Sequence, residues 1–269
     1  MTSQLERLRA LAQGDTPFAP VGGTFGAQLH EVERGRVATG TAVLRPAANF
    51  AAALVLADMT LSMAAATVLS AEQQIHTLTM RAHWAGGTVP AAPTALAGTG
   101  RLVHIDADNA LSTCEVHADD GELVGTFTCR CAVLPLVGER RRGAAGAAGG
   151  AAGGDMLDAM ALADLGPDGV RAVAAPALSN SVGLVQGGVL AAIVAAALES
   201  AIVAARPRLA GAPPDLDLTY VRAVPADGTT ITAHAEVLHA GSRFATARAE
   251  LRDAAGRPAV FASSARWAG

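Results

Sequence analysis

The chain has 269 residues, of which 51% are hydrophobic and 16% are charged, and its formal net charge is −4. This composition allows a substantial core and excludes a globally disordered chain. Only 3% of the residues are aromatic and the pI is near 6.0, so neither a base-stacking surface nor a basic nucleic-acid-binding face is expected.

The N-terminus, MTSQLERLRALAQGD, is charged and amphipathic and lacks the apolar run of a signal peptide. Apolar runs of about 20 residues occur only in alanine-rich segments, which are too weakly apolar for a membrane span. Of the three cysteines, Cys129 and Cys131 would share one strand face, which disfavours a disulfide between them, and Cys114 leaves the count odd. We therefore expect a soluble, cytoplasmic protein with reduced thiols and no membrane contact.

The first strong element is an alanine-rich helix over residues 52–70, which is so apolar that it must be buried over most of its circumference. Asp58 is the only charged residue in it. A lone carboxylate in such a helix is costly unless it is paired or functional, and burial raises its pKa toward the range of an acid–base catalyst. A structural hydrogen bond to nearby Thr60 or Ser62 is the alternative interpretation.

Four strands of about 8–12 residues are predicted after this helix. They are followed at residues 138–154 by GERRRGAAGAAGGAAGG, which we interpret as a flexible linker. The linker divides the chain into a first domain at 1–137 and a second at 155–269.

The second half repeats the pattern of the first. Matching hairpins carry a histidine, a glutamate and a glycine at places 135 positions apart (239 − 104): His104 and His239, Glu115 and Glu250, Gly121 and Gly256. A second alanine-rich helix is expected over 189–205. Each half therefore consists of short strands, one long buried helix and four longer strands, which is an α+β arrangement.

The second helix is preceded by SNSVGLVQGGV at residues 179–189. A helix N-terminus presents N–H groups without partners, and the lack of a Cβ at Gly187 and Gly188 lets a carbonyl oxygen approach them closely. Donors placed in this way stabilise the oxyanion of thioester hydrolysis. Asn180 and Gln186 are suited to orient a water molecule or the thioester. If the two glycines are considered alone, the alternative interpretation is structural: they let the loop turn tightly into the helix.

The spacing Asn180-x-x-Gly183-x-x-Gln186-Gly187-Gly188, followed by a buried helix, resembles the PaaI-type branch of the hotdog acyl-CoA thioesterases. The resemblance covers most of both halves, with Gln186 where the family usually has histidine. It implies two tandem hotdog domains, each an antiparallel sheet wrapped around a long buried helix. It also implies an acyl-CoA thioesterase that needs no cofactor beyond the coenzyme A of its substrate, and a homodimer of double hotdogs.

The family's carboxylate lies seven residues after the second glycine, where this chain has Ala195, and the aligned position in the first half is Asp58. Conversely, Phe50 and Ala51 stand in the first half where the glycine pair is due. The family builds its site between two subunits. The resemblance therefore implies one complete site, combining Asp58 with the glycine loop of the other half, and one empty site.

Thr77 matches a family position whose hydroxyl assists the carboxylate's water, and its counterpart, Pro213, has no hydroxyl. Asp58 would either activate water or attack the thioester directly. Arg222 and Arg243 are candidates for binding the phosphates of coenzyme A. No histidine spacing supports a metal site.

A non-catalytic acyl-CoA-binding protein is the main alternative, in which the empty site is the start of general decay. The presence of Asp58 argues against it, because a relic would not need this carboxylate. A hotdog dehydratase or hydratase is disfavoured, because no histidine lies within a few residues of Asp58.

Overall fold

A computed structural model describes residues 3–44, 49–85, 93–136, 156–166, 169–210 and 215–267. The predicted linker at 138–154 lies outside these ranges, as do the predicted domain boundaries at residues 137 and 155. Pro213, the proposed counterpart of Thr77, also lies outside them.

The described strands form one twelve-stranded antiparallel sheet. The first half contributes β1 (Gln28–Glu33), β2 (Arg36–Gly40), β3 (Gln73–Trp84), β4 (Leu96–Ile105), β5 (Asn109–Ala118) and β6 (Leu123–Pro135). The second half contributes β7 (Ala163–Asp164), β8 (Val170–Val173), β9 (Asp215–Tyr220), β10 (Thr230–Ala240), β11 (Phe244–Arg252) and β12 (Pro258–Trp267). Alternate residues of strands such as β5 are buried, because successive side chains point to opposite faces.

The two halves of the chain contribute their strands in equivalent order: from each edge to the centre, the first, second, fourth, fifth, sixth and third strands of that half follow one another. The order of the whole sheet is β1-β2-β4-β5-β6-β3-β9-β12-β11-β10-β8-β7, so β3 and β9 meet at the centre. The two halves join through residue pairs running from Thr79–Thr219 to Ala82–Leu216. Bulges also recur: β4 bulges at Val103 and β10 at Leu238, 135 positions apart (238 − 103).

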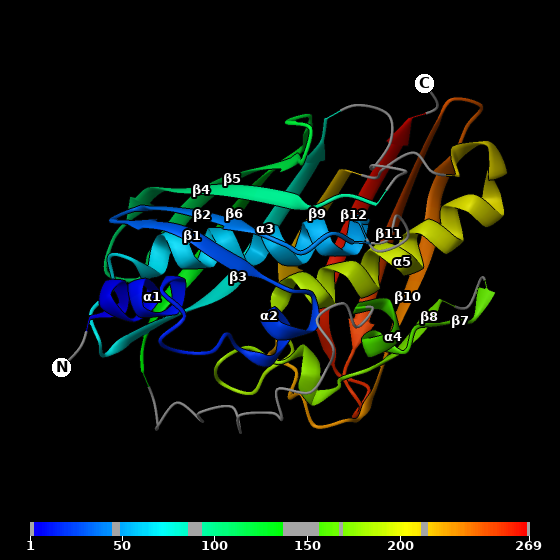
Figure 1. Cartoon of the computed structure of the whole chain (residues 1–269). Helices are drawn as coiled ribbons and strands as arrows, with labels where there is room; N and C mark the ends of the chain where they lie inside the picture. The colour runs from blue at the N-terminus through cyan, green and yellow to red at the C-terminus, as the bar shows by residue number, and fades with distance from the viewer. Residues whose placement is uncertain are drawn as a thin grey trace.

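Two long helices, α3 (Asn49–Ala66) and α5 (Gly187–Ala205), occupy the inner side of the sheet. Figure 1 shows α3 enclosed between the β1–β2 hairpin and the rest of the sheet, with α5 beside it. The predicted large antiparallel sheet around buried helices is thus confirmed. The first helix ends before residue 70, because the hydroxyl of Thr67 donates to the Ala64 carbonyl and accepts from the Gly35 N–H at 2.7 and 2.6 Å.

The short helices α1 (Gln4–Ala12) and α2 (Pro20–Thr24) attach the N-terminal segment to both halves. The buried amide of Gln4 donates to the Gln73 carbonyl at 2.9 Å, which holds α1 on the start of β3. The hydroxyl of Thr24 donates to the Ala177 carbonyl at 2.7 Å, which ties α2 to the second half. The other short helices are α4 (Met156–Met160), η3 (Pro176–Leu178) and η4 (Pro207–Leu209).

By length and composition alone, α5 is apolar enough to cross a membrane, with a mean hydropathy of 2.2. In the structure 61% of this stretch is buried inside the protein, as expected for a core helix. The three cysteines are buried free thiols, and the sulfur atoms of Cys129 and Cys131 lie 3.2 Å apart.

Candidate active site

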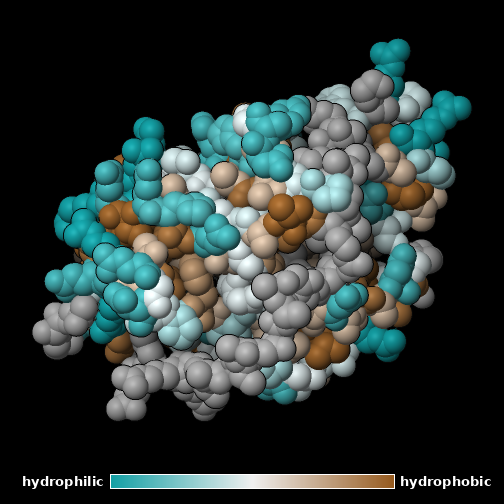
Figure 2. Space-filling model, in the orientation of Figure 1, coloured by the Kyte–Doolittle hydropathy of each residue, from teal (hydrophilic) through white to brown (hydrophobic). Residues whose placement is uncertain are grey.

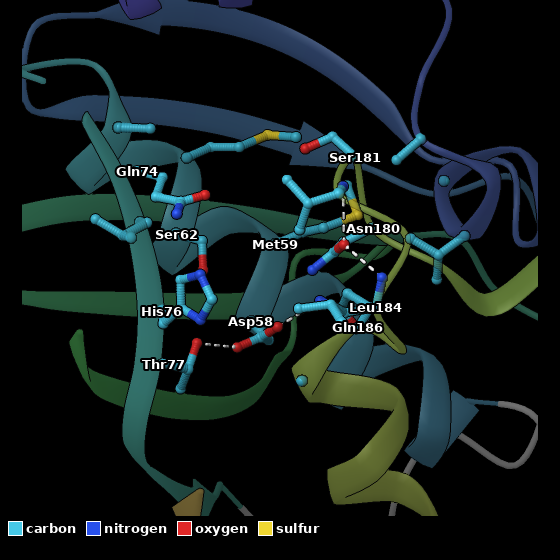
Figure 3. Close-up of a pocket in the computed structure, with 18 of the residues that line it drawn as sticks. Asp58, Met59, Ser62, Gln74, His76, Thr77, Asn180, Ser181, Leu184 and Gln186 are labelled. Carbon is cyan, nitrogen blue, oxygen red and sulfur yellow. Dashed lines mark hydrogen bonds between the residues drawn. The ribbon is translucent and has the colours of Figure 1, made fainter. Parts of the chain in front are cut away.

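Asp58 lies on α3 at the point where the N-terminus of α5 meets this helix, and only 3% of its surface is exposed. Three donors hold its carboxylate (Figure 3). The hydroxyl of Thr77 donates to Oδ1 at 3.1 Å, while the Gln186 amide and the Gly188 N–H donate to Oδ2 at 2.5 and 3.1 Å. The structure thus brings three of the predicted site residues, Thr77, Gln186 and Gly188, to Asp58 from both halves of the chain. Thr60 and Ser62 are not among these donors.

Burial raises the pKa of Asp58 from an ordinary 3.8 to about 6. Loss of hydration disfavours the charged form, and the hydrogen bonds from Gly188 and Thr77 offset part of this effect. A carboxyl group with a pKa near 6 is ionised at neutral pH and still basic enough to accept a proton from water.

Gln186 and the two glycines form the start of α5. Gln186 is the N-cap of this helix, and its side-chain oxygen accepts from the Val189 N–H at 3.1 Å while its amide nitrogen reaches Asp58. One residue thus caps the helix and fixes the carboxylate. Gly187 is the first helical residue, so its N–H has no partner within the helix.

Each glycine clears space for a different neighbour. A Cβ at Gly187 would lie 3.0 Å from Asp58 Oδ2, and a Cβ at Gly188 would lie 2.5 Å from the Leu54 carbonyl oxygen and 2.6 Å from the Cα of Val55. Gly187 therefore keeps room beside the carboxylate, and Gly188 lets α3 and α5 touch backbone to backbone. The prediction that both N–H groups hold an oxyanion is modified, because the Gly188 N–H is bonded to Asp58 in this structure.

A bulge in β3 turns Thr77 toward Asp58. Thr77 pairs with Cys131 and Thr79 pairs with Arg130, so Leu78 is an extra residue in the strand. Met80, further along β3, already faces the core, and a regular alternation would point Thr77 the other way. The extra residue reverses the alternation and sends the Thr77 hydroxyl inward.

Asn180 has a structural role in the loop before α5. Its side-chain oxygen accepts from the N–H groups of Val182 and Leu184 at 3.0 and 3.1 Å, which closes the loop on itself. Asn180 also lines the cavity in front of Asp58, so the loop that it orders forms part of the site wall (Figure 3).

The two predicted phosphate ligands lie in different places. Arg222 lines the cavity near Tyr220, and its guanidinium donates to the Pro258 carbonyl at 3.2 Å. Arg243 lies in the turn between β10 and β11 and is not among the described residues that line this cavity.

The cavity in front of Asp58 has a volume of about 1000 Å³. Sequence reasoning missed three of its residues: Ser62, one turn after Asp58 on α3; His76, beside Thr77; and Tyr220, whose hydroxyl donates to the Gly187 carbonyl at 3.0 Å. Figure 3 shows Ser62 and His76 beside Asp58 and Thr77. Burial raises the pKa of Tyr220 well above its usual value, so this hydroxyl stays protonated and can donate.

Apolar side chains occupy the positions that align with Asp58 and with the first glycine of the pair in the other half. Ala195 occupies the α5 position that corresponds to Asp58, and it is 1% exposed. Phe50 stacks on Trp84 with ring centroids 4.7 Å apart, and Trp84 meets the edge of Phe127 at 5.6 Å. Within the described ranges no group of three or more histidine, cysteine or acidic residues could hold a metal ion.

Residues 175–267 match a family model described as the acyl-CoA thioesterase N-terminal domain. No curated protein matches the chain. Among solved structures, a provisionally named thioesterase from Novosphingobium aromaticivorans superposes with a TM-score of 0.55 at 15% identity, over 90% of this chain and 98% of that chain. This structure shares the fold of nearly the whole chain.

Two further solved structures match about half of the chain. The PaaI protein of the E. coli phenylacetic acid degradation operon has a TM-score of 0.41 and 11% identity, over 49% of this chain and 94% of that chain. A phenylacetic acid degradation-related protein from Ralstonia eutropha has a TM-score of 0.41 and 22% identity, over 46% of this chain and 98% of that chain.

Proposed function

We propose that the chain is a thioester hydrolase that cleaves acyl-CoA at one composite site between its halves, on the premise that residues 175–267 match the acyl-CoA thioesterase family model. The observation that carries the proposal is the pairing of a buried carboxylate, Asp58, with the N-terminus of α5 in the other half. The carboxylate supplies a base, and the helix N-terminus supplies a donor for the thioester oxygen.

In the proposed reaction a water molecule on Asp58 Oδ1 attacks the thioester carbon. Oδ1 accepts only from Thr77 among the described residues, so it has room to accept a proton from water. The N–H of Gly187, which has no partner within its helix, receives the developing oxyanion. The bond between the new oxygen and the acyl carbon forms, the carbon–sulfur bond breaks, and the proton passes from Asp58 to the coenzyme A sulfur. The products are the free acid and coenzyme A.

We assign the hydroxyl of Thr77 a positioning role: it holds Oδ1 toward the water. Thr77→Val should lower kcat by about tenfold or more and raise the pKa of Asp58, since the lost hydrogen bond favours the charged form. The acidic limb of the pH–rate profile would then move to higher pH. Thr77→Ser, which keeps the hydroxyl, is the matched control. An unmoved limb in Thr77→Val would contradict this role.

The tandem hotdog architecture and its single working site are part of the proposal. The mirrored strand order, the matching bulges at Val103 and Leu238, and the equivalent helices support a duplicated hotdog unit. The second pseudo-site has Ala195 in place of a carboxylate and Phe50 stacked on Trp84 in place of a ligand space. One half supplies the base and the other supplies the donors.

Arg222 is the candidate contact for the phosphates of coenzyme A, because it lines the same cavity as Asp58. The alternative function is acyl-CoA binding without hydrolysis. The raised pKa of Asp58 favours catalysis, because burying a carboxylate opposes folding and a simple binding site has no need of it.

The test is release of free thiol from a panel of acyl-CoAs, together with calorimetric titration of the chain with a non-hydrolysable acyl-CoA thioether. We expect catalytic release and one bound ligand per chain. Binding without release would favour the alternative function, and two ligands per chain would contradict the single-site proposal.

A further inference from the structure

The wall of the cavity next to Asp58 follows one face of α3. From Ala51 to the end of this helix, the partly exposed residues are Ser62, Met63 and Ala66, and all three line the cavity. Met59, one residue after Asp58, lines it as well. These positions lie one, four, five and eight residues after Asp58, which places them on one side of a helix. The exposed face of α3 is therefore a continuous wall that begins at the carboxylate.

The opposite wall comes from the N-terminal segment. Leu8 and Leu11 of α1 and Phe18 of the following loop line the cavity and, like Met63, pack against a small second hydrophobic cluster of Leu29, Val37 and Ala64. Figure 2 shows hydrophobic residues on this part of the molecule, around α1 and β1. Because Gln4 fastens α1 to β3, this wall has a fixed position relative to α3.

Polarity changes along the cavity. Ser62 and His76 lie close to Asp58, whereas methionine, leucine and phenylalanine side chains line the part near α1, together with the polar Gln4 and Gln74 and the charged Glu6 and Arg7. A ligand that places a thioester at Asp58 would therefore extend an apolar group along α3 toward α1. Glu6, Arg7 and Gln74 also line the cavity, so the apolar surface available to that group is the one formed by Met59 and Met63 of α3 and Leu8 and Leu11 of α1.

The length of the wall sets the size of that group. Eight residues of helix from Asp58 to Ala66 span about 12 Å, and an extended alkyl chain advances about 1.25 Å per carbon, so the wall accommodates about ten carbons. This apolar wall, more than two turns of helix, is longer than a single aromatic ring needs.

We propose that this chain prefers linear acyl groups of about eight to twelve carbons, with Met63 lining the acyl site and the leucines of α1 bounding its far end. This proposal rests on the proposed thioesterase function. It assigns Met63 as a specificity-determining residue, because its side chain lies between the carboxylate end and the α1 end of the wall.

The experiment compares kcat/KM for butanoyl-, decanoyl- and phenylacetyl-CoA in the natural protein, Met63→Trp and Met63→Leu. We expect decanoyl-CoA to be the best substrate of the natural protein. Met63→Trp should lower the ratio of decanoyl to butanoyl kcat/KM at least tenfold. Met63→Leu conserves the side-chain volume and should leave that ratio within about twofold. The ratio is measured within one variant, so partial loss of folded protein does not affect it.

A preference for phenylacetyl-CoA, or an equal fall for all three substrates in Met63→Trp, would overturn the proposal while leaving thioesterase activity intact. If the natural protein hydrolyses none of them, the proposed function fails, and binding measurements then test whether the acyl site exists. Decanoyl-CoA binding at least tenfold more tightly than free coenzyme A, with the difference lost in Met63→Trp, would support the site. Equal binding of decanoyl-CoA and coenzyme A would overturn it. If Met63→Trp does not fold, Ala66→Leu replaces it with the same expected change in ratio.

Discussion

Asp58→Asn is expected to lower kcat for acyl-CoA hydrolysis on the order of 10³-fold, because the amide cannot accept a proton from water. The same change should stabilise the fold at pH 8. Asparagine has the shape of aspartate, so one side-chain atom can still accept from Gln186 and Gly188 while the other donates to Thr77. The carboxylate charge, which is costly to bury, is removed.

The sign of the stability change follows from the pKa of Asp58. The pKa is raised to about 6 in the folded protein from 3.8, so the folded state binds the proton more tightly than the unfolded state. Stability is therefore lost as pH rises from about 4 to about 6, and the loss is about 3 kcal/mol above that range. Asp58→Asn should recover much of this loss at pH 8 and none at pH 4.

Thermal unfolding of both proteins between pH 4 and pH 8 measures this difference directly. Asp253→Asn is a control of opposite sign, since hydrogen bonds from the Arg257 backbone N–H and guanidinium, each 2.9 Å long, lower the pKa of the Asp253 carboxyl group. That variant should lose stability at neutral pH and keep its activity. An Asp58→Asn protein that unfolds at a lower temperature at pH 8 would contradict a buried charged carboxylate.

Single-turnover hydrolysis in ¹⁸O-labelled water distinguishes the two possible roles of Asp58. If Asp58 is a base, the label enters only the released acid. If it attacks the thioester, the label is found in the protein carboxyl group after turnover. We expect the first result, because three donors hold this carboxylate in place.

Gly188→Ala is expected to be strongly destabilising. Its methyl group would lie 2.5 Å from the Leu54 carbonyl oxygen and 2.6 Å from the Val55 Cα, and backbone atoms cannot rotate away. The helices α3 and α5 would have to separate, at a cost of about 1–3 kcal/mol or more. Because Asp58 lies one turn beyond Leu54, the separation should also displace the carboxylate and lower kcat about 100-fold.

Two other glycines provide matched comparisons. Gly187→Ala places a methyl group 3.0 Å from Asp58 Oδ2 and should reduce kcat more than it reduces the unfolding temperature. A methyl group at Gly23 would meet no packed neighbour within 4 Å, so Gly23→Ala should keep both activity and stability. Equal stability of Gly188→Ala and Gly23→Ala would show that the helices do not meet at Gly188.

The recurring strand pattern and the approach of Thr77, Gln186 and Gly188 to Asp58 could be predicted from the sequence. Hairpin residues recur at a constant spacing, and Asp58 is the one charged residue in an otherwise uncharged helix. Its partner residues follow from the spacing of Gln186, Gly187 and Gly188. All of these signals depend on local residue types, which a sequence displays directly.

Other features depend on contacts that no local pattern encodes. The bulge at Leu78 reverses the alternation of β3, and nothing in the alternation of apolar and polar residues marks it. Whether the Gly188 N–H binds a substrate or Asp58 depends on how closely the two helices approach. The structural role of Asn180 depends on its fit to its own loop, and the closure of the cavity by α1 depends on packing between distant segments.

The hydrogen bonds of Asp58 to Gln186 and Gly188 span 128 and 130 positions of the chain. During synthesis on a ribosome, the nascent first half therefore carries a carboxylate whose main partners have not yet been made. Until residues 186–188 arrive, the first half can hold Asp58 only protonated or in water. Contacts of such long range form late in folding. Enzymatic competence would thus arise in one step, when the second half docks, and a truncated translation product would be inert.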